Sequence, residues 1–193
     1  MTTPSLDPVA CAVLVTVSFV IAGACQAMWL ASPLSRRFDR PLDRHRTFRG
    51  HRLLGANKTA RGFVVMVPAT GVAFMCVGTW LTAAGRAVWP YGPLGYVALG
   101  LVAGLGFMAG ELPNSFLKRQ LGIAPGSAAR GTIAGPVFFA LDRVDSLLGL
   151  LVALAAVAPV PPLTMAIILV VGPLLHGAFS VLTFRLGGKA RAA

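Results

Sequence analysis

Two carboxylates stand close together in a protein that has few acidic residues. Only six Asp and Glu occur among 193 residues, and the stretch LDRVDSLLG (141–149) holds Asp142 and Asp145. Residues three apart share a helix face, so these carboxylates point the same way and Arg143 points elsewhere. Mg²⁺ commonly takes one or two carboxylates from a protein and completes its shell with substrate phosphates and water. We therefore predict Asp142 and Asp145 as Mg²⁺ ligands, with Glu111 as a third.

These acids interrupt an otherwise apolar stretch, which carries an energetic cost. A charge at the centre of a membrane costs about 2.5 to 3.5 kcal/mol, whereas each neighbouring Leu, Val or Phe returns only about 0.3 to 0.6 kcal/mol. The carboxylates must then face a polar cavity, a cation or a basic partner rather than lipid. An internal ion pair of Asp142 or Asp145 with Arg143 or Lys118, which only fixes helix packing, is the alternative interpretation.

Basic and hydroxyl side chains occur together in the segment GELPNSFLKRQLGI (110–123). Pro113 suits the first turn of a helix, so we expect a helix to begin there with Ser115, Lys118 and Arg119 on one face. Hydroxyl, ammonium and guanidinium groups beside a helix N-terminus suit phosphate oxygens. The alternative is that Lys118 and Arg119 only anchor the chain at the membrane surface.

A third polar segment, GHRLLGANKTARGF (50–63), resembles the start of a phosphate-binding loop. Gly50 and Gly55 have the spacing of a Walker A motif, but Ala56 and Asn57 precede Lys58 and no strand precedes the glycines, so the motif is absent. Backbone and side-chain donors here can still surround an anion. The candidate donors are Asn57, Lys58, Thr59 and Arg61. The alternative is basic charge that serves membrane topology alone.

The composition indicates which kind of fold positions these polar side chains. Hydrophobic residues make up 56% and the 22 glycines bring the share to about two-thirds, against roughly 45 to 50% in soluble domains. Charged residues make up 12%, too few to cover a soluble surface. We predict an all-α polytopic membrane protein with a single integral-membrane domain over 1–193. Five apolar segments are candidate spans. They are 9–30, 62–83, 94–109, 133–160 and 163–184.

The distribution of charge predicts the orientation. Nine of the 17 Lys and Arg residues lie between Ser32 and Gly62. The positive-inside rule then places loops 31–61 and 110–132 in the cytoplasm, together with the C-terminal tail and its Lys189 and Arg191, and the N-terminus outside. The net charge of +11 does not indicate a nucleic-acid partner, because the basic stretch has no interleaved aromatic platform of the kind that single-strand binders use.

Small residues predict how the third span packs. Gly100 and Gly104, then Gly106 and Gly110, form two small-xxx-small pairs. Missing side chains at this spacing let a neighbouring helix backbone approach closely. We therefore predict close helix contacts along this span.

The three polar segments together resemble the CDP-archaeol synthase family, small five-span lipid cytidylyltransferases related to CDP-diacylglycerol synthases. The resemblance extends from about Gly50 onward and is carried by NKTARG (57–62), SFLKR with the following LGI (115–123) and LDRVD (141–145). The last two match, in the same order, the S-x-hydrophobic-K-R and D-R-hydrophobic-D elements of the larger family. Glu111 stands where the family has Asp, and Ala60 where an aromatic residue is more familiar.

The resemblance implies transfer of CMP from CTP to a lipid phosphate, phosphatidate or archaetidate-like, which releases pyrophosphate and leaves a CDP-lipid. It implies catalytic roles for Lys118, Arg119, Asp142 and Asp145. It implies that CTP is bound by Asn57, Lys58, Thr59, Arg61 and Ser115. The Mg²⁺ ligands would be Glu111, Asp142 and Asp145. The protein would lie in the plasma (inner) membrane with a cytoplasmic active site, without nucleic acid and with room for a homodimer.

Two non-enzymatic functions are alternatives. A small transport protein could line an ion path with Asp142 and Asp145, although its charges should then be spread through the membrane depth. A catalytically inactive homologue could act as a scaffold, an alternative left open by Glu111 and Ala60. A CDP-alcohol phosphotransferase is excluded because its motif begins with Asp-Gly, a pair that occurs nowhere in the chain.

Overall fold

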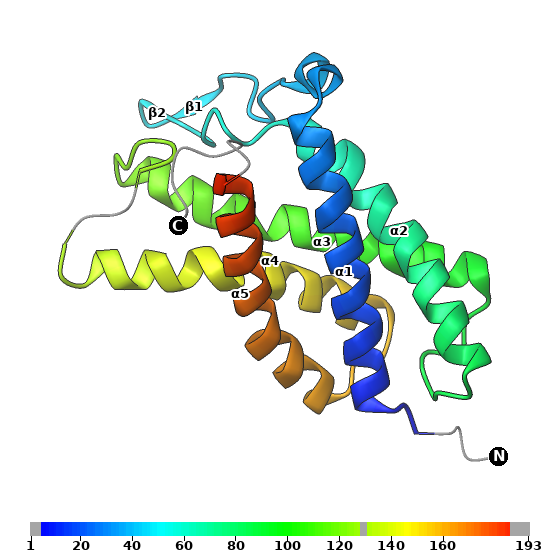
Figure 1. Cartoon of the computed structure of the whole chain (residues 1–193). Coiled ribbons are helices and arrows are strands. Elements are labelled where there is room, and N and C mark those ends of the chain that lie inside the picture. The colour runs from blue at the N-terminus through cyan, green and yellow to red at the C-terminus, as the bar shows by residue number, and fades with distance from the viewer. Residues whose placement is uncertain (1–4, 128–130, 186–193) are drawn as a thin grey trace.

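Each of the five predicted apolar segments forms a helix in the computed structural model, which describes residues 5–127 and 131–185 (Figure 1). The helices are α1 (Pro8–Ala31), α2 (Ala60–Ala83), α3 (Pro93–Gln120), α4 (Ala134–Val157) and α5 (Pro162–Arg185). Between α1 and α2 lie a short 3₁₀ helix, η1 (Pro33–Phe38), and an antiparallel hairpin of β1 (Thr47–Phe48) and β2 (His51–Arg52). The hairpin was not predicted. The basic residues Lys189 and Arg191 of the predicted cytoplasmic tail lie outside the described residues.

Three of the described helices, α1, α2 and α3, are long and apolar enough to cross a membrane. Within α5 the shorter stretch Pro162–Leu175 is apolar. Helix α4 has the required length but carries Asp142, Arg143 and Asp145 in its first half. The fold is therefore mostly helical with three clear apolar spans, as expected for a protein that lies in lipid.

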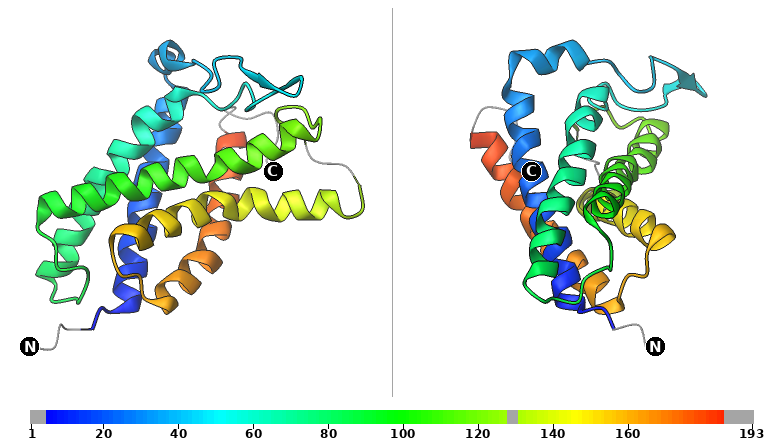
Figure 2. Two further views of the ribbon diagram at one scale, coloured as in Figure 1. Left: turned by 180° about the vertical axis from the view of Figure 1, so that it is seen from behind. Right: turned by 90° about the vertical axis from the view of Figure 1, so that its right-hand side faces the viewer.

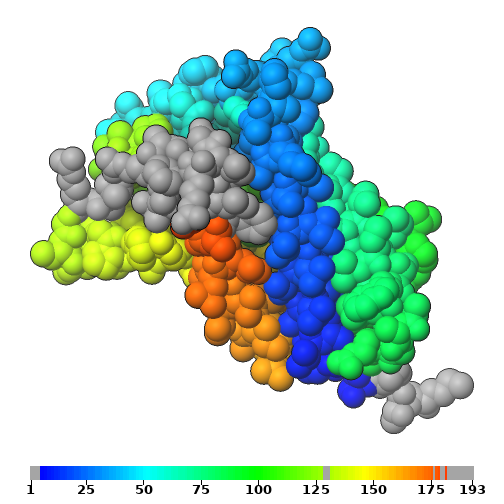
Figure 3. Space-filling model, viewed as in Figure 1, coloured from blue at the N-terminus to red at the C-terminus, as the bar shows by residue number. Residues whose placement is uncertain are grey.

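Helix α1 lies at the centre of one face, between α2 and α5 (Figure 3). On the other side of the molecule α3 and α4 run side by side and cross the direction of α1 (Figure 2). The described core lies between these layers. Its largest fully buried side chains include Leu14 of α1, Phe74 of α2 and Leu150 of α4. The packing places α3 and α4, which carry most of the predicted site, in direct contact.

One end of the molecule, which we call the far end, comprises residues 5–8, 84–93 and 158–162. Asp7 caps α1 there by accepting hydrogen bonds from the N–H groups of Val9 and Ala10, and its other oxygen binds Arg86 Nη2 at 2.6 Å. Trp89 Nε1 donates to the Pro159 carbonyl at 2.8 Å. These contacts join the start of α1 to the α2–α3 connection and the α4–α5 turn.

The opposite end, the basic end, comprises residues 32–61 and the last turn of α3. Trp29 Nε1 donates to the Arg61 carbonyl at 2.9 Å, which holds the end of α1 against the start of α2. The hairpin rests on the end of α3, where the rings of Phe48 and Phe116 lie 6.1 Å apart. Gln120 Nε2 adds a contact to the backbone of the hairpin at 3.4 Å. The basic loop therefore lies beside the polar end of α3.

The glycine pairs of α3 pack against two different helices, which confirms the prediction of close packing. A Cβ atom at Gly100 would lie 2.6 Å from the Thr70 carbonyl oxygen of α2. A Cβ atom at Gly106 would lie 2.6 Å from the Gly149 carbonyl oxygen of α4. Because a side chain at either position would collide with backbone, glycine is what permits these approaches.

The prediction that a helix begins at Pro113 was wrong. Pro113 lies inside α3, which runs without interruption from the apolar segment 94–109 through residues 110–120. A proline lacks one backbone donor, but packing against a neighbouring helix offsets the missing bond. Close to Pro113, α3 packs on α4, with Gly110 against Gly149. Lys118 and Arg119 are consequently near a helix C-terminus rather than an N-terminus.

Candidate functional site

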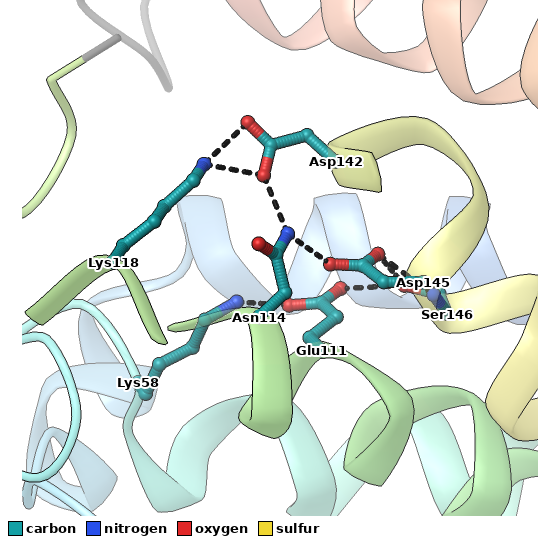
Figure 4. A network of polar contacts seen from close by, with 7 residues as sticks. All are labelled: Lys58, Glu111, Asn114, Lys118, Asp142, Asp145 and Ser146. Atoms are coloured by element: carbon teal, nitrogen blue, oxygen red, sulfur yellow. Dashed lines mark hydrogen bonds and ion pairs between the residues drawn. The ribbon is translucent and has the colours of Figure 1, made fainter. Parts of the chain in front are cut away.

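A continuous network of polar side chains connects α3, α4 and the loop before α2 (Figure 4). Glu111, Asn114 and Lys118 lie on one face of α3 because they are spaced by three and four residues. The network consists of Lys58, Glu111, Asn114, Lys118, Asp142, Asp145 and Ser146. It lies where the basic end meets the α3–α4 contact.

Asp142 is bonded to both Lys118 and Asn114 in this network. Lys118 Nζ donates to both of its oxygens, each at 2.5 Å. The Asn114 amide Nδ2 donates to Asp142 Oδ1 at 2.7 Å and to Asp145 Oδ2 at 2.8 Å. One amide nitrogen therefore lies between one oxygen of each aspartate.

Glu111 connects the same network to the start of α2. Its carboxylate forms an ion pair with Lys58 and accepts a hydrogen bond from Ser146 Oγ at 3.0 Å. The Ser146 backbone N–H also donates to Asp145 Oδ1 at 2.7 Å. Ser146 thus links the carboxylate of Glu111 to that of Asp145.

The charges of the network do not balance. Three carboxylates, at Glu111, Asp142 and Asp145, face two ammonium groups, at Lys58 and Lys118. The excess is one negative charge, and it belongs to Asp145, which forms no ion pair within the described residues. A charge removed from water without a counter-charge is unfavourable. The arrangement therefore favours a further cation.

The residues fit Mg²⁺ held jointly with a substrate. Within residues 5–127 and 131–185, no three Asp, Glu, His or Cys side chains form a group that could hold a metal ion by themselves. Mg²⁺ rarely uses such an all-protein cage and more often takes one or two carboxylates together with phosphates. Asp142 and Asp145 offer such a pair of oxygens. The Glu111 carboxylate, the predicted third ligand, is instead bound to Lys58 and Ser146.

The ion pair that we gave as the alternative interpretation is present between Asp142 and Lys118. It does not account for the whole network, because among the described residues Asp145 has only uncharged donors. The predicted residue Arg119 is not part of the network. Arg119 is 8% exposed, and its Nε and Nη1 atoms have no hydrogen-bond partner in the described part of the chain. A buried guanidinium with open donors suits a phosphate.

The structure does not bring every predicted residue into the network. Arg61 Nη2 donates to the Leu30 carbonyl at 3.1 Å, and Arg61 Nη1 lies 3.6 Å from an Asp39 oxygen. This side chain connects the ends of α1 and α2. Arg143 lies over the Phe139 ring, 3.5 Å from its centroid, and points away from the network as predicted.

Three further predicted residues lie near the network without being part of it. Asn57 is exposed in the loop before α2, and Thr59 occupies the N-cap position of that helix without a side-chain capping bond. Ser115 is half-buried on α3. The network therefore contains Lys58, Glu111, Lys118, Asp142 and Asp145 of the predicted set.

Asn114 and Ser146 were missed by the sequence reasoning. Asn114 follows Glu111 by three residues and precedes Lys118 by four, which is the signal of a shared helix face. The expectation that a helix begins at Pro113 concealed it, since Glu111 then lay outside that helix. Ser146 carried only the weak signal of a hydroxyl next to Asp145.

Comparison with known proteins agrees with this combination of fold and site. The family model described as CarS-like, CDP-archaeol synthase, matches residues 11–191. A CDP-archaeol synthase of Pyrococcus furiosus is 30% identical over 163 residues, which cover 83% of this chain and 87% of the relative. One from Methanospirillum hungatei is 31% identical over 156 residues, and these cover 77% and 87%.

A solved structure gives the same likeness in three dimensions. It is described as that of an intramembrane enzyme for archaeal membrane lipids biosynthesis. The two chains align with a TM-score of 0.61 and 27% sequence identity, over 86% of this chain and 90% of the other. The likeness therefore covers the fold as well as the polar segments.

Proposed function

The chain belongs to the CDP-archaeol synthase family, and from that premise we propose that it transfers CMP from CTP to a lipid phosphate, phosphatidate or archaetidate-like, releasing pyrophosphate. The protein is a CTP-dependent lipid cytidylyltransferase of the membrane. This membership disfavours the transport alternative, and the CMP-transfer assay below tests the alternative of an inactive homologue. The observation that carries the detailed proposal is the pair Asp142 and Asp145 held within reach of Lys118 by the packing of α3 on α4.

The reaction joins two polyanions, so charge dominates its barrier. An oxygen of the lipid phosphate attacks the α-phosphorus of CTP, and the bond from that phosphorus to the bridging oxygen breaks as pyrophosphate leaves. No covalent intermediate on the protein is needed. The protein contributes by positioning the two phosphates in line and by placing positive charge around them. Mg²⁺, held by Asp142 and Asp145, would supply neutralising charge at the phosphate oxygens.

The basic side chains of the network would exchange partners when substrate binds. Lys58 and Lys118 are paired with Glu111 and Asp142, and phosphate oxygens can replace those carboxylates as acceptors. Arg119 has open donors before any substrate arrives. Support for CTP from Asn57, Thr59, Arg61 and Ser115 remains a prediction, since these side chains lie beside the network.

We propose five membrane crossings, with the N-terminus outside and the basic end on the cytoplasmic side of the plasma membrane. The basic end contains nine Lys and Arg residues in 32–61, whereas in the far end Arg86 is paired with Asp7. The positive-inside rule favours this orientation. CTP is supplied from the cytoplasm, so the network would face the compartment of its substrate.

The test uses purified full-length protein with labelled CTP, Mg²⁺ and a panel of lipid phosphates, followed by mass analysis of the product. A CDP-lipid and pyrophosphate are the expected products, and the preferred lipid identifies the substrate. The absence of a CDP-lipid with every lipid phosphate would contradict the proposal. Dependence on Mg²⁺ is measured by adding EDTA and then restoring the metal.

A further inference from the structure

The amide of Asn114 is only half used in the network. Its nitrogen Nδ2 donates to one oxygen of Asp142 and to one oxygen of Asp145. Its oxygen Oδ1 is buried and has no hydrogen-bond partner among the described residues, and the whole residue is 9% exposed. Figure 4 shows this oxygen on the side of the amide that faces away from Asp145. A buried acceptor without a partner is rare in folded proteins and requires an explanation.

The nitrogen occupies the position that suits a cation. It lies within 2.8 Å of an oxygen from each of two carboxylates, and these are the groups that a divalent cation would bind. An N–H group attracts carboxylates but repels a cation. The amide is planar, and a half-turn about its Cβ–Cγ bond exchanges nitrogen and oxygen without any movement of the helix. This terminal torsion is broad and roughly two-fold, so both orientations are accessible.

We propose that Asn114 is an oxygen ligand of the divalent cation held by Asp142 and Asp145, and that its amide turns by half a rotation when the cation binds. This rests on the proposed function, which places a cation at these carboxylates. Without the cation, the N–H groups of Asn114 hold the two acids together. With the cation bound, Oδ1 gains a partner and the cation takes over the task of the lost N–H donors. Nδ2 then occupies the place that Oδ1 held, where an oxygen of the substrate would be its acceptor.

Glu111 has its own partners in this structure. Its carboxylate is bound by Lys58 and by Ser146 Oγ, and it has no direct contact with Asp142. In this structure Glu111 is joined to the network through Lys58 and Ser146. The oxygens of Asp142, Asp145 and Asn114 then form the protein part of the cation shell, and hard divalent cations favour such oxygen ligands.

The test measures Mn²⁺ affinity by electron paramagnetic resonance on full-length protein in detergent, so that activity is not the readout. Asn114→Asp keeps an oxygen and removes the N–H donors, whereas Asn114→Leu removes both. We expect Asn114→Asp to bind Mn²⁺ at least as tightly as wild type and Asn114→Leu to bind it about tenfold or more weakly. Gln120→Leu removes another amide from the same helix, outside the network, and should leave Mn²⁺ affinity unchanged.

Asn114→Asp adds a negative charge and so raises Mn²⁺ affinity whatever the role of Asn114; the neutral Asn114→Leu decides. If Asn114 only donates to the acids, its loss frees both carboxylates and Mn²⁺ affinity does not fall. Mn²⁺ affinity is measured without and with CTP, because substrate phosphates would complete the shell of the cation. Wild-type affinity in Asn114→Leu under both conditions contradicts the ligand role. If Asn114→Leu does not fold, as judged by size-exclusion elution, Asn114→Ala provides the same comparison.

The labelled-CTP assay on wild-type protein separates this inference from the proposed function. Formation of a CDP-lipid together with unchanged Mn²⁺ affinity in Asn114→Leu would leave the function standing and remove the ligand role. Mn²⁺ binding that depends on Asn114, without any CDP-lipid product, would support the ligand role and contradict the proposed function.

Discussion

In the proposed reaction, Asp142 would contact both the charged substrate and the charged side chain of Lys118. Its side chain is 47% exposed while that of Lys118 is 11% exposed, so one side of the ion pair is open to an incoming phosphate or cation. In the proposed reaction this half-exposed carboxylate would exchange Lys118 for a cation partner.

Asp142→Asn should reduce CMP transfer by at least about 100-fold, because the amide cannot supply the charge that neutralises phosphates through a cation. The rate is measured with labelled CTP at saturating lipid phosphate. The matched control is Asp7→Asn, the same substitution at the far end, where Asn caps a helix about as well as Asp. A rate near wild type in Asp142→Asn would remove the proposed metal role of this residue.

Lys58 and Glu111 provide a second test at the residue scale. If Lys58 binds a phosphate of CTP, Lys58→Met should raise KM for CTP by about 10- to 100-fold, the loss expected for a charge-assisted hydrogen bond. Glu111→Gln should change KM much less, because Lys58 remains available.

The double variant Lys58→Met with Glu111→Gln distinguishes phosphate binding by Lys58 from a purely structural Lys58–Glu111 ion pair. An ion pair that only fixes packing predicts equal effects of the two single changes and no further effect of combining them. A phosphate role predicts that the double variant resembles Lys58→Met.

At the scale of elements, the α3–α4 contact positions the network. A Cβ atom at Gly149 would lie 2.5 Å from Gly110 Cα and 2.9 Å from Gly110 N, so any larger residue forces the helices apart. Gly149→Val should destabilise the protein by about 1 to 3 kcal/mol, as overpacking does, and should also reduce activity because Asn114 then separates from Asp142. Melting temperature and CMP transfer measure the two effects.

Gly177→Val is the control for that substitution. No heavy atom of the described chain lies within 4 Å of a Cβ atom at this position in α5, so the melting temperature should not fall. Equal behaviour of the Gly149 and Gly177 variants would show that the close approach of α3 to α4 is not what positions the carboxylates.

The conformation of residues 43–54, between η1 and α2, depends on one buried carboxylate, that of Asp43. Burial opposes ionisation of Asp43, but hydrogen bonds from Arg52 and from the N–H groups of His45 and Leu54 outweigh it and hold the pKa of this carboxyl below its ordinary 3.8. A lowered folded-state pKa contributes stability that is present above the unfolded-state value and is lost as pH falls through the folded-state value. The loop should therefore be tight near neutral pH and loosen only in strong acid.

Proteolysis tests this pH dependence. Asp43→Asn should make Arg44, Arg46 and Arg49 sensitive to trypsin at neutral pH, where the wild-type loop resists. Pepsin should cut the wild-type loop increasingly as pH falls below the ordinary Asp value. A variant that resists trypsin as wild type does would show that Asp43 does not hold the loop.

The helices could be predicted from the sequence because apolar length is a property of a segment alone. The hairpin could not, because its turn uses Arg49 and Gly50 with φ of 52° and 78°, and Arg-Gly is a weaker signal for such a turn than Asn-Gly. The sequence also indicated that Asp142 needs a charged partner, and the structure pairs it with Lys118, the ion pair given as the alternative; its metal role stays a prediction. Asn114 was missed because its place beside Glu111 and Lys118 requires α3 to continue through Pro113. That continuation depends on the packing of α3 against α4, which is a tertiary contact.

At the scale of the whole molecule, the two ends differ in charge and in contacts. The basic end combines the loop, the start of α2 and the polar end of α3, whereas the far end is joined by the hydrogen bonds of Asp7 and Trp89. An odd number of crossings is needed if the N-terminus lies outside and the C-terminus in the cytoplasm. The proposed orientation therefore makes a prediction for each end.

Cysteine labelling tests this orientation. With Cys11, Cys25 and Cys76 replaced by alanine, single cysteines are introduced by Ala56→Cys at the basic end and Ala84→Cys at the far end, both exposed. A membrane-impermeant maleimide should label the Ala84→Cys protein in intact cells and the Ala56→Cys protein only after permeabilisation, since the more basic end stays inside. The opposite pattern would place the carboxylates and lysines outside, where cytoplasmic CTP could not reach them, and would contradict the proposed orientation even if the purified protein were active.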